Sequence, residues 1–233
     1  MEPLHITLML SILFCSLVAG LLFGFAVVVM PGIAKLPDKE FLLAFKYMDG
    51  IIQDDQPLFI LVWGGSILSV IITSVLGIMN LSGTHFYLLI IASVLYLLGV
   101  QLPTFRFNIP LNNSLQNLDI EALEGTEAAI FRTGFETPWN RWNRLRTANA
   151  IIAVLMLLLL LLGLWLASNA NRRLIQCLSD RNRGLSEDVW LKCEFFHWVA
   201  MGPLSAHIER MNLEFVLNFH SRSHVFGKKG HQL

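Results

Sequence analysis

Long stretches without charged residues are the strongest constraint on how this chain folds. Residues 6–30, 56–105 and 147–171 contain no Asp, Glu, Lys or Arg. A helix needs about 20 apolar residues to cross a bilayer core, so the first and third stretches fit one crossing each and the second fits two. Residues 155–162 show no alternation of polar and apolar types, which argues against a transmembrane β-barrel. The sequence therefore predicts a bundle of membrane-spanning helices.

A short polar run divides the second stretch into two spans. Residues 80–84 read Asn-Leu-Ser-Gly-Thr, and most of these residue types favour turns. The predicted fold class is an all-α membrane protein, a four-transmembrane-helix bundle with a short interfacial helix and a partly structured loop before the last span. The four predicted spans cover about residues 6–30, 58–79, 85–102 and 148–168.

The overall composition agrees with a membrane location. Hydrophobic types make up 55% of the 233 residues and charged types only 15%, against about 25% charge in soluble domains. The formal net charge is zero, so no nucleic-acid partner is expected. The expected partner is the lipid bilayer, and the expected localisation is an integral, multi-pass membrane protein (plasma or inner membrane if bacterial). We expect the membrane domain to cover residues 1–168 and a polar, partly disordered tail to cover 169–233.

The orientation in the membrane and the oligomeric state stay open at this point. The loops 31–57 and 103–147 carry eight Lys and Arg residues, against four shortly after the last span. Because positive residues favour the cytoplasm, this count places both long loops inside the cell. If Arg141, Arg144 and Arg146 are instead buried for function, the counts become five and four and decide nothing.

The loop after the first span contains a predicted amphipathic helix. Four apolar residues recur at helical spacing and form one stripe: Phe41, Phe45, Met48 and Ile52. Asp49 lies off this stripe, together with Lys39 and Lys46. We therefore predict a short helix that lies at the membrane interface or caps the bundle. A packing role, without chemistry, is the favoured interpretation.

The loop before the last span carries the residues of greatest interest. Pro110 should block a regular helix, while Asn108 and Asn112 can bond to the freed backbone groups. Further along, four side chains share one face of a helix that runs into the last span: Trp139, Trp142, Asn143 and Arg146. Two interpretations compete. The Trp and Arg side chains belong to the interfacial belt and reach lipid headgroups, or they wall a pocket for a flat ligand at the mouth of the bundle.

Three motifs, in their order and relative to the four spans, resemble the anthrone oxygenase-like membrane family. They are Val-Met-Pro-Gly-Ile-Ala-Lys-Leu-Pro at residues 29–37, Asn108-x-Pro110-Leu111-Asn112, and Trp139-x2-Trp142-Asn143-x2-Arg146-Thr147. The resemblance covers roughly residues 10–167. It implies the oxidation of an anthrone to an anthraquinone by dioxygen, without a metal, a flavin or any other cofactor.

Such a reaction needs a base, a cation or amide donors at the developing oxyanion, and a dry aromatic slot. On this resemblance Arg146 and Asn143 are the candidate catalytic residues, and the substrate-binding candidates are Asn108, Asn112, Trp139 and Trp142. No residue stands out as the base. His85, Asp54 and Asp55 are more simply explained as a turn residue and as partners of a helix N-terminus.

A second class of function competes on equal terms, namely a non-catalytic membrane protein that binds a lipid or other hydrophobic molecule or scaffolds a partner. Transport is disfavoured because no ionisable residue lies inside a predicted span. No metal site is predicted, although two pairs in the tail have a ligand spacing compatible with a helix: Cys193 with His197 and His220 with His224.

Overall fold

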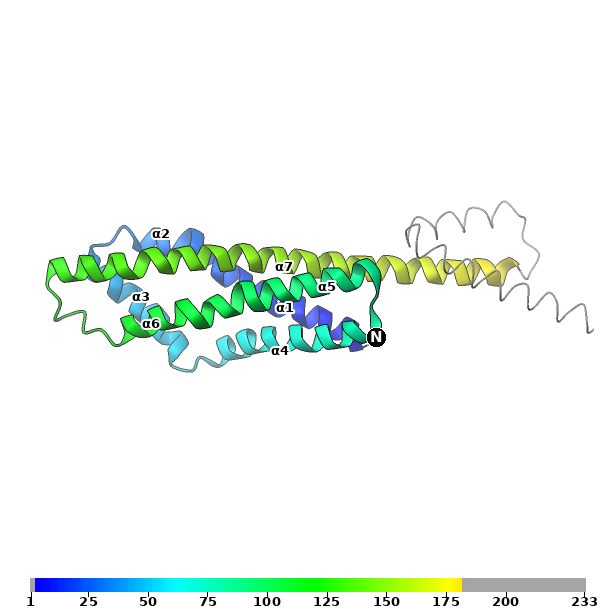
Figure 1. Cartoon of the computed structure of the whole chain (residues 1–233), viewed down its shortest axis with the longest axis horizontal. Coiled ribbons are helices and arrows are strands. Elements are labelled where there is room, and N and C mark those ends of the chain that lie inside the picture. The colour runs from blue at the N-terminus through cyan, green and yellow to red at the C-terminus, as the bar shows by residue number, and fades with distance from the viewer. Residues whose placement is uncertain (1–2, 182–233) are drawn as a thin grey trace, which may run out of the picture. The chain divides into compact units, whose positions relative to one another are not determined.

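The computed structural model describes residues 3–181. The Cys193–His197 and His220–His224 pairs lie outside the described residues, as does most of the tail. Three helical segments follow the N-terminus as one continuous helix, α1 (Pro3–Gly24), η1 (Phe25–Val29) and α2 (Met30–Ile33), and α3 (Asp38–Gln53) comes next. The chain then forms α4 (Pro57–Asn80), α5 (Gly83–Tyr96), η2 (Leu97–Gln101), η3 (Thr104–Asn108), α6 (Ile109–Gln116) and α7 (Gly125–Arg181) (Figure 1).

Four of these helical stretches are long and apolar enough to cross a membrane: Pro3–Ile33, Pro57–Asn80, Gly83–Gln116 and Gly125–Arg173. Every regular element in the described part of the chain is helical. The predicted all-α membrane bundle is therefore confirmed. The third and fourth helices extend well beyond the predicted spans, so the loop before the last span is reduced to residues 117–124.

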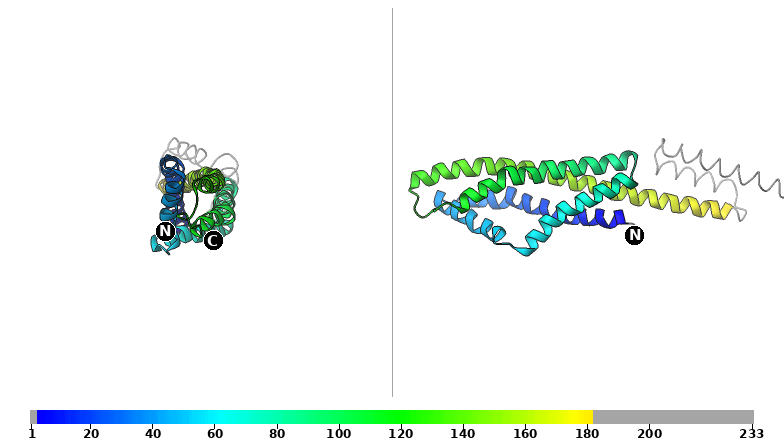
Figure 2. Two further views of the ribbon diagram at one scale, coloured as in Figure 1. Left: turned by 90° about the vertical axis from the view of Figure 1, so that its left-hand side faces the viewer. Right: turned by 60° about the horizontal axis from the view of Figure 1, so that its bottom comes forward.

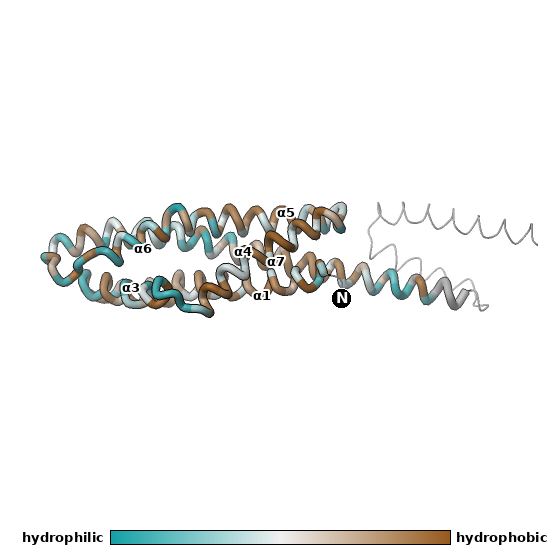
Figure 3. The backbone as a smooth tube through the Cα atoms, turned by 90° about the horizontal axis from the view of Figure 1, so that it is seen from below, coloured by the Kyte–Doolittle hydropathy of each residue, from teal (hydrophilic) through white to brown (hydrophobic). Residues whose placement is uncertain are grey.

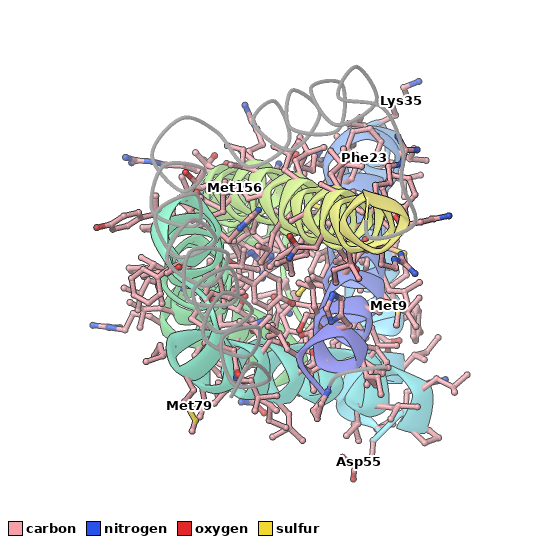
Figure 4. The ribbon with its side chains drawn as sticks, turned by 90° about the vertical axis from the view of Figure 1, so that its right-hand side faces the viewer. Met9, Phe23, Lys35, Asp55, Met79 and Met156 are labelled. Carbon is pink, nitrogen blue, oxygen red and sulfur yellow. The ribbon has the colours of Figure 1, made fainter. Side chains whose placement is uncertain are left out.

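Large apolar side chains cover the outside of the bundle. Leu68 is 60% exposed and Met79 is 76% exposed, and Met79 projects away from the helices in Figure 4. Hydrophobic residues also dominate much of α4 and α5, whereas hydrophilic residues gather around α3 (Figure 3). Soluble monomers rarely expose large contiguous apolar patches, so lipid is the medium that this surface fits.

Three wider, π-helical turns follow from three prolines. The turns η1, η2 and η3 each contain the residue four positions before a proline, namely Pro31, Pro103 and Pro110 respectively. A proline has no N–H to donate to that residue's carbonyl and its ring clashes with it, so a wider turn relieves the helix. Pro110 thus interrupts the regular α-helix, as predicted, but it does not end the helical stretch, because η3 absorbs the distortion and α6 continues after it.

The freed carbonyl at one of these turns has a side-chain partner. Asn149 Nδ2 on α7 donates to the carbonyl oxygen of Gly99, four residues before Pro103, at 3.3 Å. Such a contact requires a close approach of the two helices. A Cβ at position 99 would lie only 2.7 Å from Cγ of Asn149, so this position needs glycine.

Replacing Gly99 with Ala should destabilise the bundle by about 1–3 kcal/mol, because an overpacked contact forces the helices apart. Thermal unfolding in detergent micelles measures the change. Gly134→Ala is the matched control, because a Cβ there meets no atom within 4 Å and a helix interior favours Ala over Gly by about 1 kcal/mol. Equal unfolding temperatures for the wild type and Gly99→Ala would contradict the close contact.

The predicted short helix is present as α3, which lies at the same end of the bundle as α6 and the start of α7 (Figure 1, Figure 2). Phe41 and Phe45 are buried as the stripe predicts, and both rings contact Phe135 of α7 at 6.5 and 4.8 Å between centroids. Asp49 is buried as well, with 4% exposure, contrary to its predicted position off the stripe. Spacing of four residues explains the difference, since positions 41, 45 and 49 share one face.

One arginine fastens α3 and the preceding turn to α7. Arg132 Nη1 lies 3.0 Å from the carboxylate of Asp38, and its Nε lies 2.8 Å from that of Glu136. Its remaining N–H groups donate to the backbone carbonyls of Leu36 at 2.9 Å and Ala34 at 2.8 Å. The guanidinium also lies 4.3 Å from the centroid of the Phe41 ring.

The bundle described above consists of residues up to Leu161, and the described residues from Leu162 belong to a second unit. The described part of that unit continues α7 to Arg181. Trp165 and Leu166 are exposed there, and Arg172 donates to the side chain of Asn169 at 2.6 Å.

Candidate functional site

A cavity of about 430 Å³ lies within the bundle unit, where α3, α4, η3, α6 and α7 contribute its walls together with the end of α1 and η1. The volume falls in the range of about 300–1,000 Å³ that is typical of small-molecule sites. Its lining includes six aromatic residues: Phe25, Phe45, Phe59, Trp63, Phe105 and Trp139. Two of the widened turns contribute directly, since η1 supplies Phe25 and η3 supplies Thr104 and Asn108.

Five of the six predicted site residues line this cavity, namely Asn108, Asn112, Trp139, Asn143 and Arg146. Arg146 is 4% exposed, so its guanidinium points into the bundle and not outward to lipid headgroups. Trp142 is the exception. Its indole does not line the cavity, and it stacks on Phe107 with ring centroids 3.8 Å apart and planes 5° from parallel.

The Arg146 guanidinium is held by neutral groups only. Its Nη1 donates to Thr104 Oγ1 at 3.0 Å and its Nη2 donates to Asn143 Oδ1 at 3.0 Å. Its carbon lies 5.9 Å from the centroid of the Trp139 ring. Among the described residues no carboxylate lies within 4.0 Å of it, and its Nε has no hydrogen-bond partner. A buried cation with an unused donor is costly unless something else in the cavity compensates for it.

Two asparagines beside Arg146 are fixed by backbone carbonyls. Asn143 Nδ2 donates to the carbonyl of Leu22 at 3.1 Å, which leaves Oδ1 to face Arg146. Asn108 Nδ2 donates to the carbonyl of Trp139 at 3.4 Å. Its Oδ1 is buried and has no partner within the described part of the chain. The cavity lining therefore includes one residue with an unused donor and one with an unused acceptor.

Asp49 is a site residue that sequence reasoning missed. Its carboxylate accepts from Asn112 Nδ2 at 2.7 Å, from Gln53 Nε2 at 2.8 Å and from Gln116 Nε2 at 2.9 Å. The other side of the Asn112 amide accepts from Trp139 Nε1 at 2.8 Å. Hydrogen bonds thus connect Asp49, through the Asn112 amide, to the indole of Trp139 on the cavity wall. The spacing of four from Phe45 was the signal in the sequence that pointed to this inward position.

The aromatic wall is a packed cluster around Trp139. Its ring lies 5.6 Å from Phe25 and 5.2 Å from Phe45, measured between centroids. The two phenylalanine rings lie 6.4 Å apart in an edge-to-face arrangement. Aromatic contacts of this geometry are favourable and hold the rings in place. The wall offers a rigid apolar surface on which a flat ring system can rest.

The other acidic and basic candidates lie elsewhere. His85 is on α5 and does not line the cavity, and Asp54 is exposed at the C-terminus of α3. Asp55 borders the cavity, but it is exposed and its side chain projects outward in Figure 4. Within residues 3–181 no group of three or more His, Cys, Asp and Glu side chains is placed to hold a metal ion, so no metal ligand is assigned there.

Comparison with known proteins supports the resemblance noted from the motifs. The sequence profile of the anthrone oxygenase family matches residues 57–156, from the start of α4 into α7. This stretch includes all five predicted residues that line the cavity, whereas Asp49 precedes it. Neither the curated proteins nor the solved structures yielded a match to the chain.

Proposed function

This chain is a membrane protein whose residues 57–156 are anthrone oxygenase-like, and from that premise we propose that it oxidises an anthrone-type polycyclic aromatic with dioxygen. One observation carries the proposal. Arg146 is buried without a carboxylate partner among the described residues, and it faces a cavity walled by aromatic rings. A site of this kind is suited to a flat substrate on which negative charge develops.

The reaction can be written without a cofactor. An anthrone has a methylene group across its central ring from a carbonyl group. Loss of one methylene proton leaves an anion whose charge spreads onto the carbonyl oxygen. The anion passes one electron to dioxygen, and the two radicals combine into a peroxide at the former methylene carbon. The protonated peroxide loses water to give the quinone, so one atom of dioxygen enters the quinone and the other leaves as water.

Arg146 and Asn143 are suited to the carbonyl end of the substrate. A guanidinium stays charged at every physiological pH, and its donors are most effective where water is excluded. The unused Nε–H of Arg146 is the donor that a substrate oxyanion would take up. Asn143 holds the guanidinium in position through its Oδ1, while its own amide is tied to Leu22.

The aromatic wall is suited to the ring system. Trp139, Phe25 and Phe45 present apolar surface next to Arg146, and dioxygen partitions well into such a hydrocarbon-like environment. Asn108 has a buried acceptor oxygen that would suit a hydroxyl group on the substrate. We assign Trp142 no contact with the substrate, because its stacking partner is Phe107 and it does not line the cavity.

The proposal is tested with the purified full-length chain in lipid nanodiscs and with anthrone as the substrate. We expect dioxygen uptake and anthraquinone absorbance to rise faster than in matched empty nanodiscs, where anthrone oxidises spontaneously. Tryptophan fluorescence reports binding in the same samples, because Trp139 and Trp63 line the cavity. Quenching by anthrone without a faster reaction would reject the oxygenase and support the non-catalytic binder of hydrophobic molecules.

A further inference from the structure

We propose that Asp49 is the base that removes the methylene proton from the substrate. This inference rests on the proposed function, which requires a base, and no carboxylate or histidine from the matched residues 57–156 lines the cavity. Three charged side chains line the cavity, namely Asp49, Asp55 and Arg146. Asp55 is exposed, and Arg146 is a cation, so among the described residues Asp49 is the one buried carboxylate on the cavity wall.

The hydrogen bonds around Asp49 leave room for a proton. A carboxylate accepts about four hydrogen bonds, and three amide groups, from Gln53, Asn112 and Gln116, occupy the two oxygens here. Each of these donors is neutral, and no cation lies within 4.0 Å among the described residues. The amides hold the carboxylate in place without taking a fourth acceptor position, which is the one that a substrate C–H proton would occupy.

The nearest lysine on the same helix is directed elsewhere. Lys46 lies three residues before Asp49, and its Nζ donates to the carbonyl of Leu118 at 2.8 Å. The side chains that contact Asp49 from α6 are the neutral amides of Asn112 and Gln116. A carboxylate whose purpose was to anchor α3 would gain more from a charged partner than from neutral amides. The arrangement keeps Asp49 free of an ion pair.

Asn112 and Trp139 are positioning residues for this base. The indole Nε1–H of Trp139 can only donate, so it fixes the oxygen of the Asn112 amide on its own side and turns the Nδ2 group toward Asp49. The same tryptophan forms the aromatic wall. Substrate stacking and base orientation therefore depend on one rigid unit.

Asp49 takes up one proton and later returns it, so the protons balance over the reaction. The methylene C–H bond breaks, the proton goes to the Asp49 carboxylate, and the electron pair passes into the ring and onto the carbonyl oxygen next to Arg146. The protonated Asp49 then returns the proton to the peroxide formed with dioxygen. Loss of the second methylene hydrogen together with the peroxide's terminal hydroxide releases water and leaves Asp49 ionised, ready for another turnover.

The test is the Asp49→Asn variant of the full chain in nanodiscs, with Asp54→Asn as the matched control because Asp54 is an exposed carboxylate on the same helix end. We expect Asp49→Asn to oxidise anthrone about 10²-fold more slowly than wild type near neutral pH, since general bases contribute at least this much. The rate should recover as the pH is raised, because hydroxide then forms the anthrone anion in solution. Anthrone deuterated at its methylene carbon should show a larger isotope effect in the variant.

Three results would overturn the assignment, and they differ from one another. If the wild type oxidises anthrone no faster than the spontaneous reaction, the proposed function is rejected, and Asp49 then has no reaction to catalyse. If the wild type is active and the rate of Asp49→Asn lies within about threefold of the wild-type rate, the proposed function stands and the role of Asp49 as the base is rejected. A variant that is slow at every pH, with the wild-type isotope effect, shows that Asp49 only holds the fold of the site.

Discussion

Arg146→Met should lower the rate of anthrone oxidation by about 10³-fold, because removal of a preorganised donor from a developing oxyanion typically costs 10²–10³. Methionine keeps the length and the apolar stem of the side chain and removes only the charged group. Its unfolding free energy should be unchanged or higher. The wild-type guanidinium is buried without a counter-ion among the described residues, and replacing such a charge with an apolar group is often neutral or stabilising.

A large loss of rate without a loss of stability is what identifies a functional residue. Arg144→Met is the matched control, since Arg144 is an exposed arginine two positions earlier on the same helix. It should leave both the rate and the unfolding temperature close to wild type. Steady-state kinetics and thermal unfolding in nanodiscs measure the two quantities. If Arg146→Met oxidised anthrone at the wild-type rate, the oxyanion role of Arg146 would be rejected.

The largest loss of stability should come from Arg132→Met, at about 3 kcal/mol. The wild-type side chain makes two ion pairs and two hydrogen bonds to backbone carbonyls, and hydrogen bonds with a charged partner contribute about 1.5–3 kcal/mol each. Solvent screening lowers the total contribution of these interactions, because the partner carboxylates are 40% and 22% exposed. Loss of the clamp frees the turn between α2 and α3 from α7.

Activity should fall along with stability in Arg132→Met, because α3 carries both Phe45 and Asp49 into the cavity. Arg141→Met provides the comparison, since Arg141 is exposed on the same helix. Thermal unfolding in micelles gives the stability difference, and hydrogen exchange at the backbone amides of residues 34–53 locates it. Protection of these amides at the wild-type level in Arg132→Met would show that other contacts hold α3.

The sequence predicted which side chains share one face of α7, but it left open whether that face points into the bundle. Helical spacing put Trp139, Asn143 and Arg146 on one side, and all three are buried and line the cavity. The same spacing did not separate Trp142 from them. Its ring leaves the cavity because Phe107, on the neighbouring helix, offers a stacking partner. Such a partner lies 35 positions away along the chain, and no local pattern reveals it.

Asp49 was missed for a related reason. An acidic residue on an amphipathic helix is normally expected to face water, and the apolar stripe through Met48 and Ile52 supported that expectation. Amide donors stabilise the buried position, and two of the three, Asn112 and Gln116, come from α6. Those partners are 63 and 67 residues away. Their presence opposite Asp49 depends on the turns that place α6 against α3.

Three uncharged stretches, one of them divided by a polar turn, were sufficient to determine the membrane bundle from the sequence alone, because lipid accepts a polypeptide only when its backbone hydrogen bonds are satisfied within each helix. That rule acts on each segment by itself and needs no knowledge of its neighbours. The site depends on contacts between segments. Only the tertiary structure determined that Arg146 lacks a counter-ion in the described part of the chain, that three amides surround Asp49, and that both residues face one cavity. Those facts depend on how helices approach one another, which the hydropathy of single segments does not specify.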